Sequence, residues 1–309
     1  MDLPTVRPHA LRPGDAIGII APAGTVRQRD SLTRGIAVLQ RLGFEVHYDD
    51  RIFQSLRYLA GDDASRAEEL HSFFENPAIR AVLSLRGGFG CSRLIPLLDE
   101  KRLRHHCKIF MGFSDITTLH LYFRRRFGWV TFHSPMAAST SLGQIGPEAE
   151  QHLRCLLTDP EYRPQMAFQD LQTWSPGVAE GKVTGGCLSI LAASLGTPYE
   201  IRTEGKILFL EDLGEEPYRL DRMLTQLRLA GKLSAVSGIL LGSFLNCDPE
   251  NEDYTVEETL RDVLVPLQVP VLAGFPAGHG PENWAFPLGV RARLDADAQR
   301  VEFIDPAVV

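Results

Sequence analysis

The stretch KIFMGFSDITTLH, residues 108–120, decides how the sequence is interpreted. Its first five residues, Lys108 followed by the apolar run 109–112, are typical of a buried strand, and a helical pattern begins at Thr117. Only a short turn separates the two. A strand that passes so directly into a helix is one half of a β-α-β unit, so this stretch predicts an α/β protein.

The same alternation of strand and helix runs through the first half of the chain. Several of the apolar runs are uninterrupted, as expected where helices cover both faces of a parallel sheet. We therefore predict an N-terminal domain with a mostly parallel sheet flanked by helices. Its predicted strands cover residues 15–20, 44–48, 81–85, 108–112 and 129–132.

The second half predicts a mixed, β-rich domain. Strands are expected at 206–210, 238–244 and 270–275, and a terminal hairpin is expected around 295–297. A proline-containing stretch with little periodicity separates the two halves. The predicted boundaries are residues 1–160 for the N-terminal domain, 161–178 for a linker and 179–309 for the C-terminal domain.

Composition narrows the range of functions. The 309 residues are 44% hydrophobic and 23% charged, and no segment approaches about 18 consecutive apolar residues, so a membrane protein is not expected. The net charge of −7 repels phosphate backbones and argues against nucleic acid as a partner. The five cysteines lack zinc-ligand spacing, and the N-terminus lacks an apolar signal core. We expect no metal and a reducing, cytoplasmic location.

Ser114 is the first candidate catalytic residue. It opens a helix directly after a buried strand, which would expose its hydroxyl beside the unpaired amides of a helix N-terminus. This arrangement is typical of a nucleophilic serine, although Ile116 replaces the second glycine of the elbow motif G-x-S-x-G. A serine followed by Asp115 is also typical of a helix cap. The segment alone leaves both interpretations open.

Residues 86–90, RGGFG, follow another predicted strand. Three glycines in four positions let the backbone approach a ligand closely. The run matches neither the dinucleotide fingerprint nor the phosphate-binding loop. It predicts either a backbone amide donor for an oxyanion or carboxylate, or simply a tight turn.

A nucleophilic serine also needs a base and an acid that orients the base. Of the nine histidines, His279 lies between two glycines directly after a strand, and His133 ends a strand that could line a cleft. Glu211 and Asp212 end a buried strand. Because successive strand side chains face opposite sides, at most one of these carboxylates can point into a given cleft. The order serine, acid, histidine is that of α/β-hydrolases.

Together with other short motifs, these residues resemble the LD-carboxypeptidase family, the muramoyltetrapeptide carboxypeptidases, which also includes the microcin C immunity peptidases. The resemblance covers nearly the whole chain. Each motif alone is weak, and their order makes the resemblance specific. The motifs are LRPGD at 11–15, RGGFG at 86–90, GFSDIT at 112–117, GGCLS at 185–189, LED at 210–212, EPYRLDR at 216–222 and GFPAGH at 274–279.

The resemblance implies a serine peptidase with a Ser-Glu-His triad, in which Ser114 is the nucleophile, Glu211 the acid and His279 the base. It also implies an oxyanion hole made by the backbone amides of Gly88 and Asp115, without a cofactor. The implied domains are a flavodoxin- or amidotransferase-like N-terminal domain and a barrel-like, swivelling C-terminal domain, in a homodimer. The implied substrate is a small peptide, the cytoplasmic murein tetrapeptide of peptidoglycan recycling. Hydrolysis of its L,D-peptide bond would release terminal D-Ala.

Such a substrate carries carboxylates and an amine, so charged residues near the triad are candidates for binding it. Arg86, Glu215 and Glu216 are the candidates, and each could equally be solvated or structural. The chain departs from the family at Phe89, where tyrosine is frequent, and at Cys187, where asparagine is frequent. Either departure could alter the pocket.

Three alternatives remain open at this point. The weakest is a nucleotide-binding α/β protein that uses the loop at residues 87–90, and the missing phosphate-binding motifs argue against it. A peptidase of the same fold could cleave a peptide–nucleotide antibiotic, as microcin C immunity peptidases do. That activity would call for an aromatic stacking residue, for which Trp174 is the candidate. A protein of another class would keep the cleft only to bind murein peptides without catalysis, and an intact triad argues against it.

Overall fold

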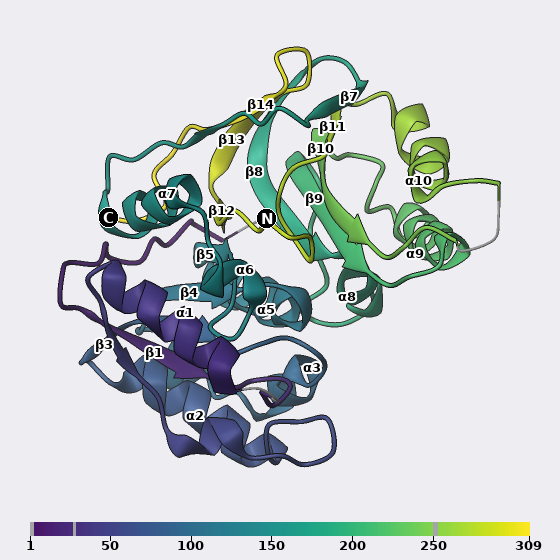
Figure 1. Ribbon diagram of the computed structural model, residues 1–309. Helices are drawn as coiled ribbons and strands as arrows, with labels where there is room; N and C mark the ends of the chain where they lie inside the picture. The colour runs from purple at the N-terminus through teal and green to yellow at the C-terminus, as the bar shows by residue number, and fades with distance from the viewer. Residues whose placement is uncertain (1–2, 27–28, 250–252) are drawn as a thin grey trace. The chain divides into compact units, whose positions relative to one another are not determined.

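The computed structural model describes residues 3–26, 29–249 and 253–309, which divide into two compact units (Figure 1). Each unit is built on one sheet, and the mixed α/β fold that the sequence predicts is confirmed. Unit 1 comprises Met1–Tyr162, Asn283–Pro287 and Ala307–Val309. Unit 2 comprises Arg163–Glu282 and Leu288–Pro306.

The sheet of unit 1 has six strands in the order β12-β5-β4-β3-β1-β2. The pairs β1–β2, β1–β3, β3–β4 and β4–β5 are parallel, so the carboxyl ends of these strands share one edge. The strands are β1 (Ala16–Ile20), β2 (Glu45–His47), β3 (Ile79–Ser84), β4 (Ile109–Gly112), β5 (Thr131–His133) and β12 (Phe286–Leu288).

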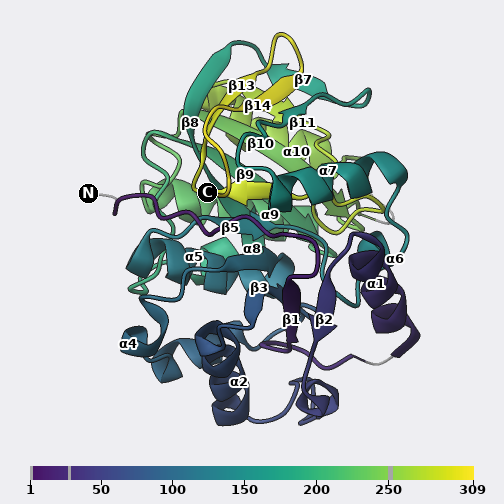
Figure 2. The ribbon, with the colours of Figure 1, turned by 90° about the vertical axis from the view of Figure 1, so that its left-hand side faces the viewer.

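Helices cover both faces of this sheet. Figure 2 shows α1 on one side of the strands and α2, α4 and α5 on the other. This explains why β1 and β4 are buried along their whole length and read as continuous apolar runs. The helices are α1 (Arg29–Arg41), α2 (Asp63–Glu75), α3 (Cys91–Leu94), α4 (Glu100–Leu103), α5 (Thr117–Phe127), α6 (Thr140–Gly143) and α7 (Pro147–Thr158). Short 3-10 turns lie at Asp50–Phe53, Ile95–Leu97 and Ser114–Ile116.

An aromatic cluster fills the space between β4 and the helices α2 and α5. The rings of Phe74 and Trp129 stack with their centres 5.5 Å apart, and Phe123 lies 5.1 Å from the same indole. Phe110 meets Phe123 edge-on at 5.0 Å. Because each of these side chains is fully buried, the cluster fixes β4 and α5, the two elements that flank Ser114.

The sheet of unit 2 has eight strands in the order β6-β14-β13-β8-β9-β10-β11-β7. Its central strands β8, β9, β10 and β11 pair in parallel, and the outer pairs are antiparallel. The sheet is therefore mixed, as expected. The strands are β6 (Gln165–Met166), β7 (Gln172–Ser175), β8 (Val178–Cys187), β9 (Lys206–Leu213), β10 (Gly238–Leu245), β11 (Val271–Ala273), β13 (Arg291–Asp295) and β14 (Arg300–Phe303).

The helices of unit 2 are α8 (Leu188–Ala193), α9 (Pro217–Leu229) and α10 (Val256–Leu264), with a 3-10 turn at Val265–Leu267. Strand β9 runs three residues beyond its predicted end, because Asp212 and Leu213 continue the ladder with β10. Glu211 and Asp212 therefore lie within the strand. Residues 161–178, which were predicted to be a linker, contain β6 and β7.

Among the helices of the described residues, none has the length and apolar character needed to cross a membrane.

The close packing of α1 on α6 makes Gly35 a sensitive position. A Cβ atom at Gly35 would overlap the carbonyl oxygen of Ala137. We expect Gly35→Ala to lower the free energy of unfolding by about 1–3 kcal/mol, because backbone must shift to admit the methyl group. Gly146→Ala is the matched control, since nothing lies within 4 Å of a Cβ atom there. Equal denaturation midpoints for the two variants would contradict this packing.

Candidate active site

Ser114 lies on a strained turn between β4 and α5. Its φ is 63°, in the left-handed region that residues other than glycine rarely occupy. Such strain persists where the surrounding structure enforces it, and it is frequent at functional sites. Within the described residues, neither the 3-10 turn nor α5 receives a side-chain cap. Helix capping, the alternative interpretation of Ser114, is therefore wrong.

Two groups fix the end of the strand that leads into this turn. The carbonyl oxygen of Gly112 accepts hydrogen bonds from His120 Nε2 at 2.9 Å and from the backbone amide of Ser134 at 3.2 Å. Burial lowers the pKa of His120 to about 4, so its imidazole is neutral near pH 7 and donates through Nε2. The His120 ring thus holds the turn in place rather than acting on the serine.

The loop at residues 86–90 lies directly against this serine. A Cβ atom at Gly87 would be 2.8 Å from Ser114 Oγ and 3.5 Å from the Asp115 amide nitrogen, so a side chain does not fit there. The carbonyl of Gly87 accepts a hydrogen bond from the Gly24 amide at 3.1 Å. Gly88 follows with φ of 109°, a conformation that glycine adopts without strain. The glycine-rich run is therefore a close approach of two backbone segments.

In unit 2, Glu211 and His279 form a hydrogen-bonded pair. Nδ1 of His279 lies 2.7 Å from Oε2 of Glu211, and the Glu211 side chain has no solvent exposure. Its position in the sheet comes from β9, which pairs with neighbours on both sides. With the Nδ1 proton on the carboxylate side, Nε2 is the basic nitrogen of the neutral imidazole.

The loop that carries His279 is held by a residue that the sequence analysis missed. The Ser243 hydroxyl on β10 accepts a hydrogen bond from the Gly280 amide at 2.8 Å, and the Ser243 amide donates to the Ala277 carbonyl at 3.0 Å. Gly278, with φ of 112°, leaves no room for a side chain, since a Cβ atom would lie 2.6 Å from Glu211 Oε2. Gly278 marks the close approach of this loop to Glu211 in the sequence, whereas nothing in the sequence marks Ser243.

The protein environment shifts the pKa values of both Glu211 and His279. Burial raises the pKa of the Glu211 carboxyl, and the hydrogen bond from His279 opposes that rise. Burial lowers the pKa of His279, but the hydrogen bond and charge of Glu211, together with the charge of Asp212, outweigh it. The pKa of His279 therefore lies above its ordinary value, and the two groups titrate as a coupled pair.

Asp212 faces away from Glu211, as strand alternation predicts. Its carboxylate accepts hydrogen bonds from the Ser189 amide at 2.7 Å and from the Leu213 amide at 2.9 Å. The Cys187 thiol, 3.4 Å away, donates to the same carboxylate, and burial raises the pKa of that thiol well above its usual range. Asp212 thus holds the start of α8, while Glu211 hydrogen-bonds to His279.

Most of the other predicted site residues have structural partners. Arg86 donates to the Thr25 carbonyl at 3.0 Å, and Glu215 lies 3.7 Å from the guanidinium of Arg219. Glu216 is exposed at the start of α9. The ring of Trp174 has the guanidinium of Arg261 4.4 Å from its centre. His133 is buried and stacks on Phe286, with ring centres 5.0 Å apart.

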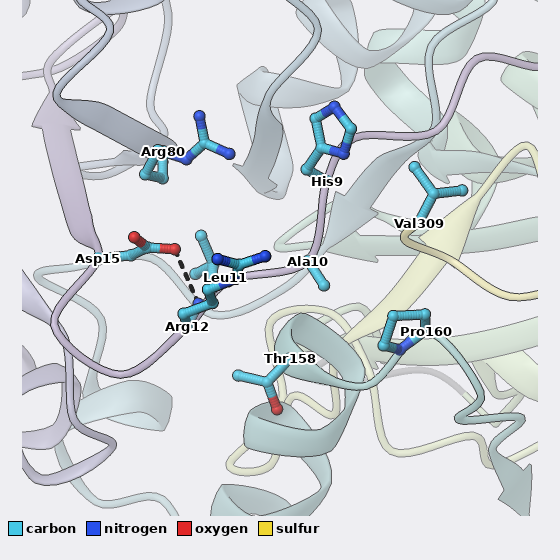
Figure 3. A pocket seen from close by; sticks show the side chains of 9 residues that line it. All are labelled: His9, Ala10, Leu11, Arg12, Asp15, Arg80, Thr158, Pro160 and Val309. Carbon is cyan, nitrogen blue, oxygen red and sulfur yellow. Dashed lines mark hydrogen bonds between the residues drawn. The ribbon is translucent and has the colours of Figure 1, made fainter.

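Unit 1 also has a hollow of about 730 Å³ at the amino ends of β1 and β3 (Figure 3). Its charged lining residues are Arg12, Asp15 and Arg80. The Arg12 amide donates to the Asp15 carboxylate at 2.8 Å, which closes the turn before β1. This hollow lies at the opposite edge of the sheet from Ser114.

Within the described parts of the chain, no three histidine, cysteine or acidic side chains lie together in a way that could hold a metal ion.

Comparisons with known proteins match both halves of the chain to one family. The LD-carboxypeptidase N-terminal domain matches residues 17–134, and the LD-carboxypeptidase C-terminal domain matches residues 180–294. A probable murein peptide carboxypeptidase of Bacillus subtilis is 39% identical over 306 residues, covering 98% of this chain and 95% of the relative.

Two solved structures extend the comparison. The muramoyltetrapeptide carboxypeptidase of Oxalobacter formigenes has a TM-score of 0.81 and 32% identity, covering 93% of this chain and 97% of that one. MccF in complex with glutamyl sulfamoyl guanosine has a TM-score of 0.90 and 26% identity, covering 98% and 99%.

The Glu211–His279 pair predicts an unusual titration. His279 should remain protonated at a pH where an ordinary histidine, of pKa 6.5, is already neutral, so its NMR titration midpoint should lie above 6.5. Glu211→Gln removes the charge that offsets burial, so the midpoint should fall. Glu302→Gln, which removes a carboxylate on β14, should leave the midpoint unchanged. An unshifted midpoint in Glu211→Gln would contradict the pairing.

Proposed function

We propose that this chain, which belongs to the LD-carboxypeptidase family, is a serine peptidase whose triad is Ser114, His279 and Glu211. The observation that carries the proposal is the buried hydrogen bond between Glu211 and His279, which is the orienting half of such a triad. The strained, uncapped turn at Ser114 supports its role as the third member.

The proposed reaction follows from these roles. His279 Nε2 takes the proton of Ser114 as the hydroxyl oxygen attacks the peptide carbonyl, and the imidazolium then protonates the leaving amine. Glu211 keeps the Nδ1 proton in place and stabilises the imidazolium. Water, activated by the same imidazole, hydrolyses the acyl-enzyme and restores Ser114.

The oxyanion of the tetrahedral intermediate would be bound by the backbone amides of Gly88 and Asp115. The close contact of Gly87 with Ser114 supports this assignment, because it brings the loop amides next to the nucleophile. The Asp115 amide lies at the start of the turn that leads into α5, where amides are not used by the helix. One such donor typically contributes a factor of about 10²–10³ to the rate.

For the substrate, we propose a murein tetrapeptide, from which terminal D-Ala is released. The names of the Bacillus subtilis and Oxalobacter formigenes proteins support this choice. This chain is 39% and 32% identical to these two proteins, compared with 26% to MccF. Arg86, Glu215 and Glu216 remain the proposed substrate-binding charges. A cytoplasmic location and a homodimer belong to the same proposal, as does the division of the triad between an N-terminal and a C-terminal domain.

Cleavage of a peptide–nucleotide conjugate is the second candidate, and its support is the TM-score of 0.90 to MccF. The stacking that a nucleobase needs would have to come from Trp174, and Arg261 already lies over that ring. This contact favours the murein peptide as the substrate.

The nucleophile assignment predicts loss of activity in Ser114→Ala. The unmodified protein should release D-Ala from UDP-MurNAc-tetrapeptide, and Ser114→Ala should lower kcat by roughly 10³–10⁶ because no acyl-enzyme can form. Ser234→Ala, a change of an exposed serine, is the control and should be as active as the unmodified protein. A microcin C analogue is assayed in parallel.

Unchanged hydrolysis in Ser114→Ala would overturn the nucleophile assignment. Turnover of the microcin C analogue alone would select the second candidate. No turnover of either substrate would count against the peptidase proposal and favour a protein that only binds peptides.

A further inference from the structure

One peptide unit in the loop beside Ser114 is held at both of its polar ends. The amide of Cys91 donates to Oδ2 of Asp115 at 2.8 Å. The carbonyl of the same peptide unit, that of Gly90, accepts a hydrogen bond from Arg66 Nη1 at 3.1 Å. Both side chains are buried, with exposures of 1% for Asp115 and 0% for Arg66. Two buried side chains, Asp115 and Arg66, thus hydrogen-bond to the backbone of a single loop.

Arg66 is itself fixed in one position. It projects from α2, and its guanidinium also donates to the Pro22 carbonyl and pairs with Asp63. A planar guanidinium with several engaged donors has little freedom to move. This contact requires glycine at position 90, because φ is 147° and a Cβ atom would lie 2.6 Å from Arg66 Nη1.

The hydrogen bond between the Cys91 amide and the Asp115 carboxylate lies next to the proposed nucleophile. Asp115 is the residue after Ser114, so a bond on its carboxylate restrains the turn that carries the serine hydroxyl. At the other end of the loop, Gly87 abuts Ser114. The loop at residues 86–91 is therefore hydrogen-bonded to the Ser114 turn at Cys91 and packed closely against it at Gly87.

We propose that Asp115 and Arg66 are positioning residues that clamp the Gly90–Cys91 peptide unit and thereby fix the Gly88 amide relative to Ser114. This inference rests on the proposed function, because it assigns a purpose to the proposed oxyanion hole. The Asp115 amide binds the oxyanion, and the Asp115 carboxylate holds the loop that supplies the second donor. Neither side chain transfers a proton.

Cys91 lies in this clamp without being a second nucleophile. Its side chain is fully buried, and burial raises the pKa of its thiol well above the usual range. A thiol that is neither exposed nor ionised is unreactive. The contribution of this residue is its backbone amide.

The clamp is tested by separating kcat from KM. Asp115→Ala should lower kcat for D-Ala release by about 10–10², because a displacement near 1 Å at a reacting site has an effect of that size. KM should change less than about threefold, since ground-state binding does not use the oxyanion donors. Asp115→Asn keeps an oxygen acceptor for the Cys91 amide and should restore most of the activity.

A second readout does not depend on the identity of the peptide. The rate at which a fluorophosphonate labels Ser114 should fall in Asp115→Ala in parallel with kcat, because phosphonylation uses the same oxyanion donors. Asp295→Ala is the matched control, since Asp295 is also buried and accepts a backbone amide, that of Ala298, at 2.9 Å. It should lower thermal stability while kcat and the labelling rate stay unchanged.

If Asp115→Ala does not fold, Arg66→Lys replaces it. Lysine keeps the buried charge but cannot reach the Gly90 carbonyl, the Pro22 carbonyl and Asp63 together, so labelling should again slow down.

The outcomes separate this inference from the proposed function. Labelling of Ser114 at an unchanged rate in Asp115→Ala or Arg66→Lys would overturn the clamp and leave the peptidase proposal standing. A fall confined to KM would overturn it in the same way. Failure of the unmodified protein to be labelled at Ser114 would overturn both, because no activated hydroxyl would exist to be positioned.

Discussion

The buried hydrogen bond between Glu211 and His279 is the constraint on which unit 2 depends. A carboxylate without solvent exposure is unfavourable unless a donor compensates it, so the His279 loop has to reach the strand. That approach requires Gly278, whose missing side chain leaves room for the carboxylate. It also requires Ser243 on the neighbouring strand, which bonds the loop on both sides of Gly278. This one pair thus accounts for the glycine at position 278 and for the serine at position 243.

In unit 1 the corresponding constraint is the strained backbone at Ser114. A left-handed serine costs on the order of 1–3 kcal/mol, and this conformation persists only if neighbouring contacts enforce it. They do so on both sides of Ser114. The Gly112 carbonyl is held by His120 and by the Ser134 amide before the turn, and the Asp115 carboxylate is held by the Cys91 amide after it. The serine has little freedom to relax into an ordinary turn.

Features that depend on neighbouring residues could be predicted from the sequence. The apolar run at 109–112 and the pattern after Thr117 predicted β4 and α5, because a sheet that is covered on both faces leaves a continuous apolar run in the sequence. Strand alternation also predicted that the side chains of Glu211 and Asp212 would point to opposite faces of the sheet. The end of β9 was predicted too early, because acidic residues rarely extend a strand, whereas pairing with β10 overrides that preference here.

Features that depend on distant contacts left no local signal. Ser243 meets Gly280 across 37 positions, and Arg66 meets Gly90 across 24, so nothing in the surrounding sequence distinguishes them from an ordinary strand serine and helix arginine. The same limit applied to Ser114, whose segment fits a helix cap as well as a nucleophile. Only the observed φ and the absence of a cap within the described residues separated the two.

The reaction and the substrate are determined by different parts of such a molecule. A triad with an oxyanion hole specifies acyl transfer, and proteins with the same fold have names that point to different ligands, a muramoyltetrapeptide for one and a sulfamoyl guanosine for another. The difference must therefore come from residues that neither the fold nor the triad requires. Phe89 is exposed beside Gly88, and Cys187 on β8 pairs with Glu211 on β9, so both positions lie next to proposed site residues. The net charge of −7 argues against nucleic acid as a partner, but it says nothing about a small peptide, because a few local side chains set the field that such a peptide meets.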